Sequence, residues 1–525
     1  MRSAAAWPRV VLRLDELEPA GFASMRDVAA AIGRFKAAKK QVVAFGDNYS
    51  QGQYLLAAQA GEVYLDPMSQ GGVMLEGLAS YRQYYREGLQ DKLGVDMHLF
   101  KVGEYKSAAE PYILDAASPE AKEADLFWLN DIWQRMLADI GKARGIAPAT
   151  LAANADALPQ QVLAARGDLA QLALQQKLVD ALKTRDQVED LLVERGVADD
   201  NAEGGFRQVD LGTYLQHLDG TLPQADTRPQ VAVVVAEGEI AGGDLPPGKV
   251  GGESTSALLR QVRDDDNVKA VVLRVNSPGG EVFASEQIRR EVAALKDAGK
   301  PVVVSMGDVA ASGGYWISMN ADRIYADPST ITGSIGIFGL FPTIDRTLGK
   351  IGVRTDGVST AKYAGAFDVT RPLDPGVATT VQAVIDKGYR DFTGKVAQAR
   401  KRDVSAIDAV ARGRVWTGAQ AQERGLVDAQ GGLDAAVADA AARARLGKPD
   451  AWQTRYVEDS AAPFSQWFGG MLQSRAGLSL LQASGLGELV LARRVQAPLR
   501  FVEDALRQRG SVKVMPLAYC FCTAQ

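Results

Sequence analysis

An internal duplication is the feature that most limits what this chain of 525 residues can fold into. The segment "VVLRLDE" begins at Val10 and "VVLRVNS" begins at Val271, 261 positions later. The same spacing separates "VYLDP" at Val63 from "IYADP" at Ile324, and later segments continue to match at slightly shorter spacings. One register held over about sixty residues indicates a tandem repeat. The chain therefore contains two copies of one structural unit.

Each copy alternates strand-like and helix-like segments. In the second copy, "KAVVLRVNS" is a nearly continuous apolar run, which is typical of a strand covered on both faces. The following segment, "EVFASEQIRREVAALKDAG", has the spacing of an amphipathic helix that ends at a glycine, and "KPVVVSM" is the next strand. This order predicts an α/β fold in which helices cover a parallel sheet.

The same patterns divide the chain into five segments. We expect a first repeat carrying Lys106, a helical extension with a linker, a second repeat carrying Ser312, a second helical extension, and a C-terminal tail, in that order: 1–117, 118–225, 226–373, 374–450 and 451–525. The strand that opens the second copy at Val231 has no counterpart in the first. We therefore expect the first repeat to be incomplete at its N-terminus, through a late start or fragmentation; the alternative is a genuine soluble variant.

Composition excludes several classes of protein. A net charge of −5 provides no long-range attraction for nucleic acid, and the sequence contains no phosphate-binding GxxxxGK[ST] loop. Its two cysteines, Cys520 and Cys522, lie in the last six residues and cannot form a disulfide framework or a four-cysteine zinc site. Its two histidines, His98 and His217, are not at metal-binding spacing. We expect no metal and no cofactor, and no apolar run is long enough to span a membrane.

The two copies differ in a reciprocal way at two positions. Ser312 in "GDVAASGGYWIS" corresponds to Gln51 in the first copy, although the neighbouring glycine and tyrosine are shared. Lys106 in "GEYKSAA" corresponds to Ala364 in the second copy. One copy has the lysine without the serine, and the other has the serine without the lysine. A Ser/Lys pair assembled across the two repeats accounts for both differences.

Such a pair is chemically competent. A serine hydroxyl is a weak nucleophile until a base removes its proton, and a neutral lysine amine can be that base. Burial favours the neutral amine because it penalises the ammonium form. Considered alone, Lys106 is more simply a solvated surface lysine and Ser312 a small residue in a turn. The reciprocal pattern favours catalysis for both.

Acyl transfer also needs backbone donors for the oxyanion. Glycines at the end of the strand in "NSPGGEV" leave amides uncovered, so we expect Gly280 and Gly313 to form the oxyanion hole. A simple turn at residues 278–280 is the alternative. Ser334 in "TGSIGIFG" is placed to hydrogen-bond the lysine amine, although such serines are more often helix caps.

Four segments together resemble a known family: "VLRVNSPGGEVFASE", "SMGDVAASGGYWIS", "STITGSIGIFG" and "FKVGEYKSAAEPY". They are similar to those of the long, tandem-repeat signal peptide peptidases of bacteria, of the protease IV type, within the S49 serine peptidases. The resemblance implies a crotonase/Clp-protease fold, with Ser312 as nucleophile and Lys106 as general base. It also implies a site between the repeats, a homotetramer with an apolar bowl, and degradation of remnant signal peptides and other apolar peptides.

The resemblance further implies a place at the bacterial inner membrane, with the catalytic part facing the periplasm. The resemblance also implies an N-terminal membrane anchor, which we expect to be missing from this sequence together with the opening strand. Two other functions stay open on the residues alone. One is an acyl-CoA hydratase or isomerase, because the crotonase fold supports that chemistry too. The other is a non-catalytic scaffold that binds peptides on apolar surfaces.

Overall fold

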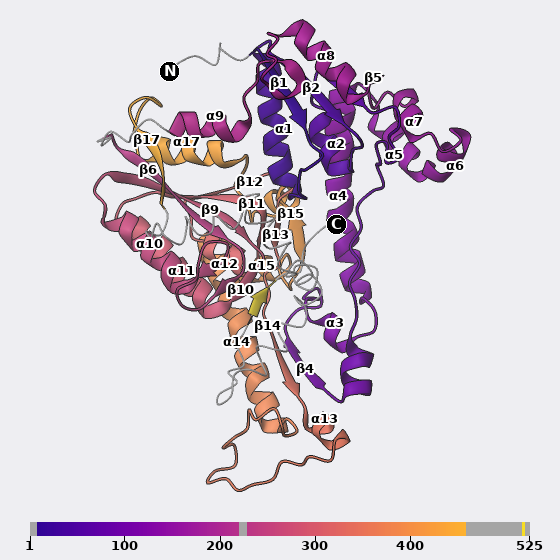
Figure 1. Cartoon of the computed structure of the whole chain (residues 1–525). Coiled ribbons are helices and arrows are strands. Elements are labelled where there is room, and N and C mark those ends of the chain that lie inside the picture. The colour runs from indigo at the N-terminus through magenta and orange to yellow at the C-terminus, as the bar shows by residue number, and fades with distance from the viewer. Residues whose placement is uncertain (1–7, 220–227, 458–516, 520–525) are drawn as a thin grey trace.

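Three ranges of the chain, residues 8–219, 228–457 and 517–519, are described by the computed structural model in Figure 1. Cys520, Cys522 and most of the predicted tail lie outside these ranges, as does part of the predicted linker before Val231. Within them, strands and helices alternate in both halves, and the pairs at the centre of each main sheet are parallel. The predicted α/β fold class is therefore confirmed.

The second half is built on an eight-stranded sheet of order β15-β13-β11-β9-β6-β17, with β12 beside β11 and β16 beside β12. Its central strand β9 alternates side chains between two cores, with Val271 and Leu273 on one face and Ala270 and Val272 on the other. The strands are β6 (Gln230–Glu237), β9 (Val268–Ser277), β11 (Val302–Ala311), β12 (Arg323–Ala326), β13 (Ile331–Gly333), β15 (Val415–Thr417), β16 (Ala429–Gln430) and β17 (Gln453–Val457).

Helices cover both faces of this sheet, as the apolar strand predicted. The larger core includes side chains from α10 (Gly252–Asp264), α11 (Val282–Asp297), α12 (Gly313–Ser318) and α14 (Pro375–Arg400). Helix α17 (Leu433–Arg443) packs on the opposite face through its alanines. Three shorter helices complete this half: α13 (Asp345–Lys350), α15 (Val404–Asp408) and α16 (Gly418–Glu423).

The first half repeats the arrangement on a smaller sheet of order β1-β2-β3-β5, all parallel. The strands are β1 (Arg9–Arg13), β2 (Gln41–Gly46), β3 (Glu62–Leu65) and β5 (Ala181–Leu182), with α1 (Phe22–Ala37) and α2 (Gln51–Ala57) between them. After them come η2 (Glu87–Leu93), α3 (Glu110–Ile113), α4 (Pro119–Arg144), α5 (Pro148–Asp156), α6 (Leu158–Ala164), α7 (Leu169–Gln175), α8 (Arg185–Arg195), η3 (Glu203–Gly205) and α9 (Leu211–Asp219).

A third sheet takes strands from both halves. Its order is β4-β14-β18-β10-β7-β8, from β4 (Asp96–Lys101), β14 (Phe338–Thr343), β18 (Leu517–Tyr519), β10 (Gly279–Glu281), β7 (Ile240–Ala241) and β8 (Val250–Gly251). Strand β4 pairs antiparallel with β14 along its whole length. The predicted first repeat therefore gives one strand to a sheet that otherwise belongs to the second half, and this pairing carries Lys106 across.

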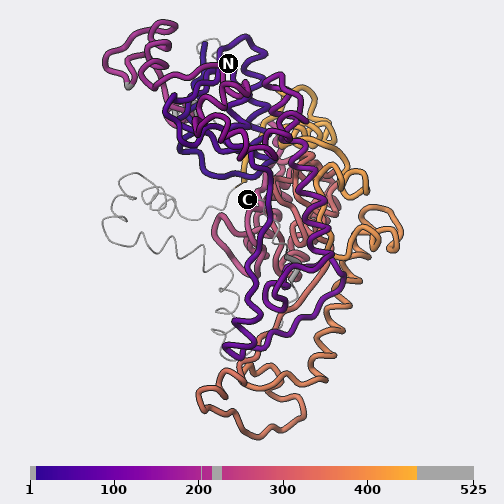
Figure 2. The backbone as a smooth tube through the Cα atoms, turned by 90° about the vertical axis from the view of Figure 1, so that its right-hand side faces the viewer, coloured from indigo at the N-terminus to yellow at the C-terminus, as the bar shows by residue number. Residues whose placement is uncertain are grey.

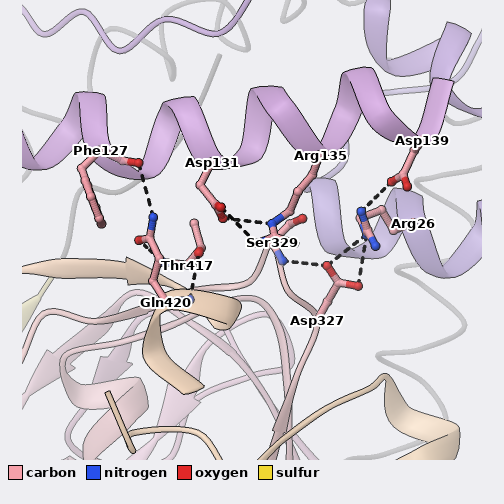
Figure 3. Close-up of polar contacts among 9 residues, drawn as sticks. All are labelled: Arg26, Phe127, Asp131, Arg135, Asp139, Asp327, Ser329, Thr417 and Gln420. Carbon is pink, nitrogen blue, oxygen red and sulfur yellow. Dashed lines mark hydrogen bonds and ion pairs between the residues drawn. The ribbon is translucent and has the colours of Figure 1, made fainter. Parts of the chain in front are cut away.

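Helix α4 runs along the seam between the halves (Figures 1 and 2). At one end, Arg26 of α1 pairs with both Asp139 of α4 and Asp327 of the second half. Farther along, the side-chain amide of Gln420 donates to the Phe127 carbonyl at 3.4 Å. Figure 3 shows these contacts along one face of the helix. An apolar cluster that includes Trp128, Ile132 and Ile331 fills the space between them.

A carboxylate from the second half also caps a helix of the first. Asp308 on β11 accepts hydrogen bonds from the Ser24 backbone N–H at 2.7 Å and from the Ser24 hydroxyl at 2.6 Å. Ser24 lies in the first turn of α1, where free amide groups favour a negative charge. The strand that leads to Ser312 is thereby tied to the first half.

No helix within the described ranges is both long and apolar enough to cross a membrane.

We expect Asp308→Ala to lower the free energy of unfolding by about 1 kcal/mol, because α1 loses the acceptor for its first turn. Asp47 is the matched control, since it occupies the duplicated position and its side chain is exposed. Urea unfolding followed by circular dichroism measures both variants. An equal loss of stability in Asp47→Ala would contradict a specific cap by Asp308.

Candidate active site

Ser312 lies at the abrupt end of β11, directly before α12. Its backbone has φ of 56° and ψ of −112°, a conformation that residues other than glycine rarely adopt. The Ser312 N–H donates to the Gly333 carbonyl at 2.8 Å, which holds the turn in place. The hydroxyl is fully buried. A strained, rigid strand-to-helix turn of this kind fixes the direction of a nucleophile.

The glycines after Ser312 are there because nothing larger fits. A Cβ on Gly314 would lie 2.5 Å from the Ser277 carbonyl oxygen, and one on Gly313 would lie 2.8 Å from the Ser285 hydroxyl. The small residues in "AASGG" therefore let the strand end at Ser277 approach the turn closely. Gly52 in the first half lies near only a flexible Met25 side chain, so the constraint there is weaker.

Lys106 reaches Ser312 from the other half of the molecule. Its Nζ lies 2.9 Å from the Ser312 Oγ, although the two residues are 206 positions apart. Lys106 follows β4, so the pairing of β4 with β14 brings it to the second half. The side chain is only 2% exposed, far from the solvated lysine that its residue type alone predicts.

Ser334 completes the surroundings of the amine. Its hydroxyl lies 3.0 Å and its carbonyl oxygen 3.1 Å from the Lys106 Nζ. Ser334 also has a positive φ of 52°, which turns both oxygens toward the same nitrogen. The structure thus brings together Ser312, Lys106 and Ser334, three of the five predicted site residues, through hydrogen bonds.

Burial makes this lysine a base near neutral pH. Loss of hydration around the ammonium lowers the pKa of Lys106 from its usual value near 10.5 to about 7. The hydrogen bonds to Ser334 involve oxygen acceptors that also suit a neutral amine, which has two N–H donors and one lone pair. At and above neutral pH the lone pair is available to Ser312.

Gly280 and Gly313 lie next to each other beside Ser312. A Cβ on Gly313 would lie 3.0 Å from the Gly280 nitrogen, so the two backbones are in close contact. Gly280 has φ of 156°, and a Cβ there would meet the Ile240 carbonyl oxygen at 1.9 Å, so only glycine fits. This is the place expected for an oxyanion hole, and the role itself stays a prediction.

The space between β10 and β14 accepts an extended segment. In this structure it holds β18, which pairs antiparallel with Gly279–Glu281 and meets β14 at Phe338. Strand β10 contains Gly280, so a segment in this position passes directly beside Ser312. The arrangement can present a peptide backbone to the hydroxyl by strand addition.

Sequence reasoning missed residues 412–414, which hold Lys106 from outside both repeats. The Arg412 carbonyl accepts a hydrogen bond from the Tyr105 N–H at 3.2 Å. Gly413 has φ of 81°, and a Cβ there would lie 2.6 Å from the Lys106 nitrogen. One signal was available, since the tripeptide Ala-Arg-Gly occurs at 165–167 and again at 411–413, ahead of the matched "LVDA" segments.

The remaining candidates have ordinary structural surroundings. His98 on β4 lies 3.1 Å from the Thr343 hydroxyl on β14, and burial lowers its pKa. Its hydrogen bond is thus to the partner strand and not to the proposed site. Within the described ranges, no group of three or more His, Cys, Asp and Glu side chains is arranged to hold a metal ion.

Comparisons with known proteins agree with this geometry. The profile of Peptidase family S49 matches residues 34–196 and 294–447, one segment in each half. Protease 4 of Salmonella typhi is 46% identical over 450 residues, which cover 86% of this chain and 71% of the relative. Protease 4 of Haemophilus influenzae is 41% identical over 428 residues, which cover 82% of this chain and 69% of the relative.

Among solved structures, a ClpP1 mutant from Listeria monocytogenes matches with a TM-score of 0.26 and 15% identity, over 39% of this chain and 94% of that one.

The buried amine predicts an unusual dependence of stability on pH. Between a folded pKa of about 7 and an unfolded pKa near 10.5, the unfolded chain binds one proton that the folded chain does not bind. The free energy of unfolding of the wild type, relative to Lys106→Met, should therefore rise with pH across this window, by up to about 1.4 kcal/mol per pH unit. Urea unfolding at pH 6, 7, 8 and 9 measures the difference. A difference that is flat across this range would show that the amine is charged in the folded protein.

Proposed function

Because the chain belongs to peptidase family S49 and is a serine peptidase, we propose that Ser312 is its nucleophile and Lys106 its general base. The observation that carries this assignment is the 2.9 Å contact between the Lys106 Nζ and the Ser312 Oγ, with the amine fully buried. Neither half of the chain supplies both groups. The catalytic unit is the seam between them.

The proposed reaction follows from the atoms at this contact. The neutral Lys106 amine accepts the Ser312 hydroxyl proton as Oγ attacks the scissile carbonyl carbon. The N–H groups of Gly280 and Gly313 stabilise the oxyanion that forms. When the C–N bond breaks, the Lys106 ammonium donates its proton to the leaving amine. Water then attacks the acyl carbon and gives a proton to the Lys106 amine. When the ester bond breaks, Lys106 returns that proton to the Ser312 Oγ, and the acid product leaves.

Ser334 has the supporting role in this scheme. Its two oxygens accept hydrogen bonds from the Lys106 amine and fix its direction, so that the nitrogen lone pair points at Ser312. Holding both groups in reacting geometry supplies much of the benefit of an intramolecular reaction. Because loss of hydration lowers the pKa of the amine, Lys106 accepts and donates a proton near neutral pH.

The substrate binds, in this proposal, as an extended strand between β10 and β14. The position of β18 supports this, since it is an extended backbone paired with both strands. Strand β14 borders this position at Phe338, and its segment Phe338–Phe341 is apolar. An apolar, extended peptide therefore matches this position better than a charged or helical one.

Remnant signal peptides are the proposed substrates. Their central region is an apolar run of 7–15 residues, which matches the apolar sequence of β14 beside the proposed binding position. The resemblance to long-form signal peptide peptidases supports this substrate and a place at the bacterial inner membrane, with the catalytic part facing the periplasm. The family match and the Ser/Lys contact favour this function over an acyl-CoA hydratase or a passive scaffold.

Self-association into a tetramer is also proposed. Phe22 at the start of α1 packs into the apolar cluster at the seam. Its duplicated counterpart Phe283, at the start of α11, is 59% exposed. In this proposal a second copy covers Phe283 as the second half covers Phe22, and a head-to-tail contact of this kind forms a ring when the rotation between neighbouring copies closes. The number four comes from the family resemblance.

Replacement of either member of the dyad should abolish hydrolysis of an apolar signal peptide. Ser312→Ala removes the nucleophile, and Lys106→Arg fails because a guanidinium stays protonated. Ser318→Ala is the matched control, because its buried hydroxyl donates to the Gly314 carbonyl on the same helix. In the wild type, kcat/KM should rise with pH through an apparent pKa near 7. Activity in Lys106→Arg, measured by peptide cleavage, would rule out proton abstraction by this residue.

Phe283→Asp should dissociate the tetramer, because it places a charge in the apolar contact. Leu163→Asp is the control, since Leu163 on α6 is 79% exposed and has no counterpart at the seam. Sedimentation velocity measures the assembly of both variants. Each Phe283→Asp monomer should keep its dyad, because Lys106 and Ser312 come from one chain. A tetramer that survives Phe283→Asp would place the contact elsewhere.

A further inference from the structure

Arg414 joins the two halves beside the catalytic lysine. It directly precedes β15 in the second half, and its side chain is 19% exposed. The guanidinium crosses the seam and pairs with Glu123 of α4 at 2.9 Å. The side chain therefore ends on the half of the molecule that supplies Lys106.

Three aromatic rings surround this guanidinium. Its carbon lies 4.7 Å from the ring centre of Tyr105, 4.8 Å from that of Trp416 and 5.4 Å from that of Phe127. A planar cation on the face of an aromatic ring is attracted to it, more strongly where water is excluded. Tyr105 is the residue immediately before Lys106, so this contact restrains the chain at the base.

The main chain of the same residue holds the other side of the amine. The Arg414 carbonyl accepts a hydrogen bond from the Ser334 N–H at 2.7 Å. Ser334 in turn provides two oxygens to the Lys106 Nζ. Gly413, between these contacts, lies directly against the Lys106 backbone. Arg414 thus contacts Tyr105, next to Lys106, through its side chain, and contacts Ser334 through its backbone carbonyl.

We propose that Arg414 is a positioning residue. It fixes the direction of the Lys106 amine and keeps water away from it, by holding Tyr105 on one side of the amine and Ser334 on the other. This inference rests on the proposed function, since it assigns Arg414 a role in the reaction of the same dyad. Arg414 itself touches neither substrate nor the reacting atoms.

The duplication supports a specific role. In the first half, the matching Ala-Arg-Gly tripeptide is followed by Asp168, whose side chain caps α7 through the Gln171 N–H. That half has Gln51 in place of the serine. The arginine is therefore present in the half that carries the serine, and a helix-capping aspartate takes its place in the half that lacks it.

The charged groups around Lys106 come from β4, from the loop that follows β4, from residues 412–414 and from α4. Lys101 on β4 donates to the Lys106 carbonyl at 3.4 Å, and Glu104 in the following loop pairs with Arg412. Arg414 pairs with Glu123 of α4. None of these side chains is among the hydrogen-bond partners of the amine, which are Ser312 and Ser334. Loss of the Arg414 contacts with Tyr105 and Ser334 is thus expected to admit water to the amine, which raises the pKa of Lys106.

The experiment compares Arg414→Met and Arg414→Lys with Arg424→Met. Met keeps the length of the side chain without its planar cation, and Lys keeps the charge without the flat surface. Arg424 is a matched control, because it also stacks on Trp416, at 3.8 Å, and on Phe127, but it does not contact Tyr105. A fluorophosphonate probe counts active sites, and kcat and kcat/KM per site are measured from pH 5.5 to 10.

We expect kcat per active site to fall about 10- to 100-fold in both Arg414 variants, as for a small misplacement of a reacting group. The apparent pKa of kcat/KM should move upward by at least about one unit, because the amine regains hydration. Arg424→Met should change neither quantity, whatever it does to thermal stability. A kcat and a pKa in Arg414→Met that match those of Arg424→Met would overturn the proposal.

Tyr105 variants keep the proposal testable if the Arg414 variants do not fold. Tyr105→Leu removes the ring under the guanidinium and should reproduce the upward pKa shift, whereas Tyr105→Phe keeps the ring and should restore the wild-type profile. A Tyr105→Leu profile identical to the wild type would also overturn the proposal. Failure of the proposed function is separate, because it would appear as cleavage by Ser312→Ala.

Discussion

The pairing of β4 with β14 is the contact on which the site depends. It carries a lysine from the first half into the interior of the second, where only close packing can keep the amine neutral. Gly413 lies against the backbone of that lysine, where a Cβ would come within 2.6 Å, and Gly336 lies close to its side chain, where a Cβ would come within 3.3 Å. The desolvation that lowers the pKa of Lys106 is therefore a property of the seam, and neither half could produce it alone.

Geometry around the serine is rigid for a related reason. A positive φ at Ser312 and another at Ser334 are each unfavourable for residues with side chains, at a cost of about 1–3 kcal/mol apiece. Backbone hydrogen bonds from the Ser312 N–H to the Gly333 carbonyl and from the Ser334 N–H to the Arg414 carbonyl hold these two conformations. The result is a hydroxyl, an amine and two further oxygens whose relative positions are set by the fold before any substrate arrives.

The duplication made much of this predictable. Comparing the copies singled out Ser312 and Lys106, because each is the position at which one copy departs from the other, and the pattern of apolar strands predicted the parallel sheet. The contribution of β4 to a sheet of the other half could not be predicted, since strand pairing between distant segments has no local signal. The segment 412–414 was missed because its role is to fit around Lys106. The repeated Ala-Arg-Gly tripeptide marks the segment, but only the structure shows that its glycine and its two arginines contact Tyr105 and Lys106.

The order of these parts along the chain has a consequence for synthesis. Of the residues at the proposed site, Lys106 is synthesised first, then Ser312 and Ser334, and the loop 412–414 that packs against the lysine comes last. Until that last loop is made, Lys106 lacks its packing against Gly413, so its amine remains hydrated and keeps its proton. On the proposed assignment, a growing chain therefore cannot activate Ser312 against its own unfolded segments before residues 412–414 have been synthesised.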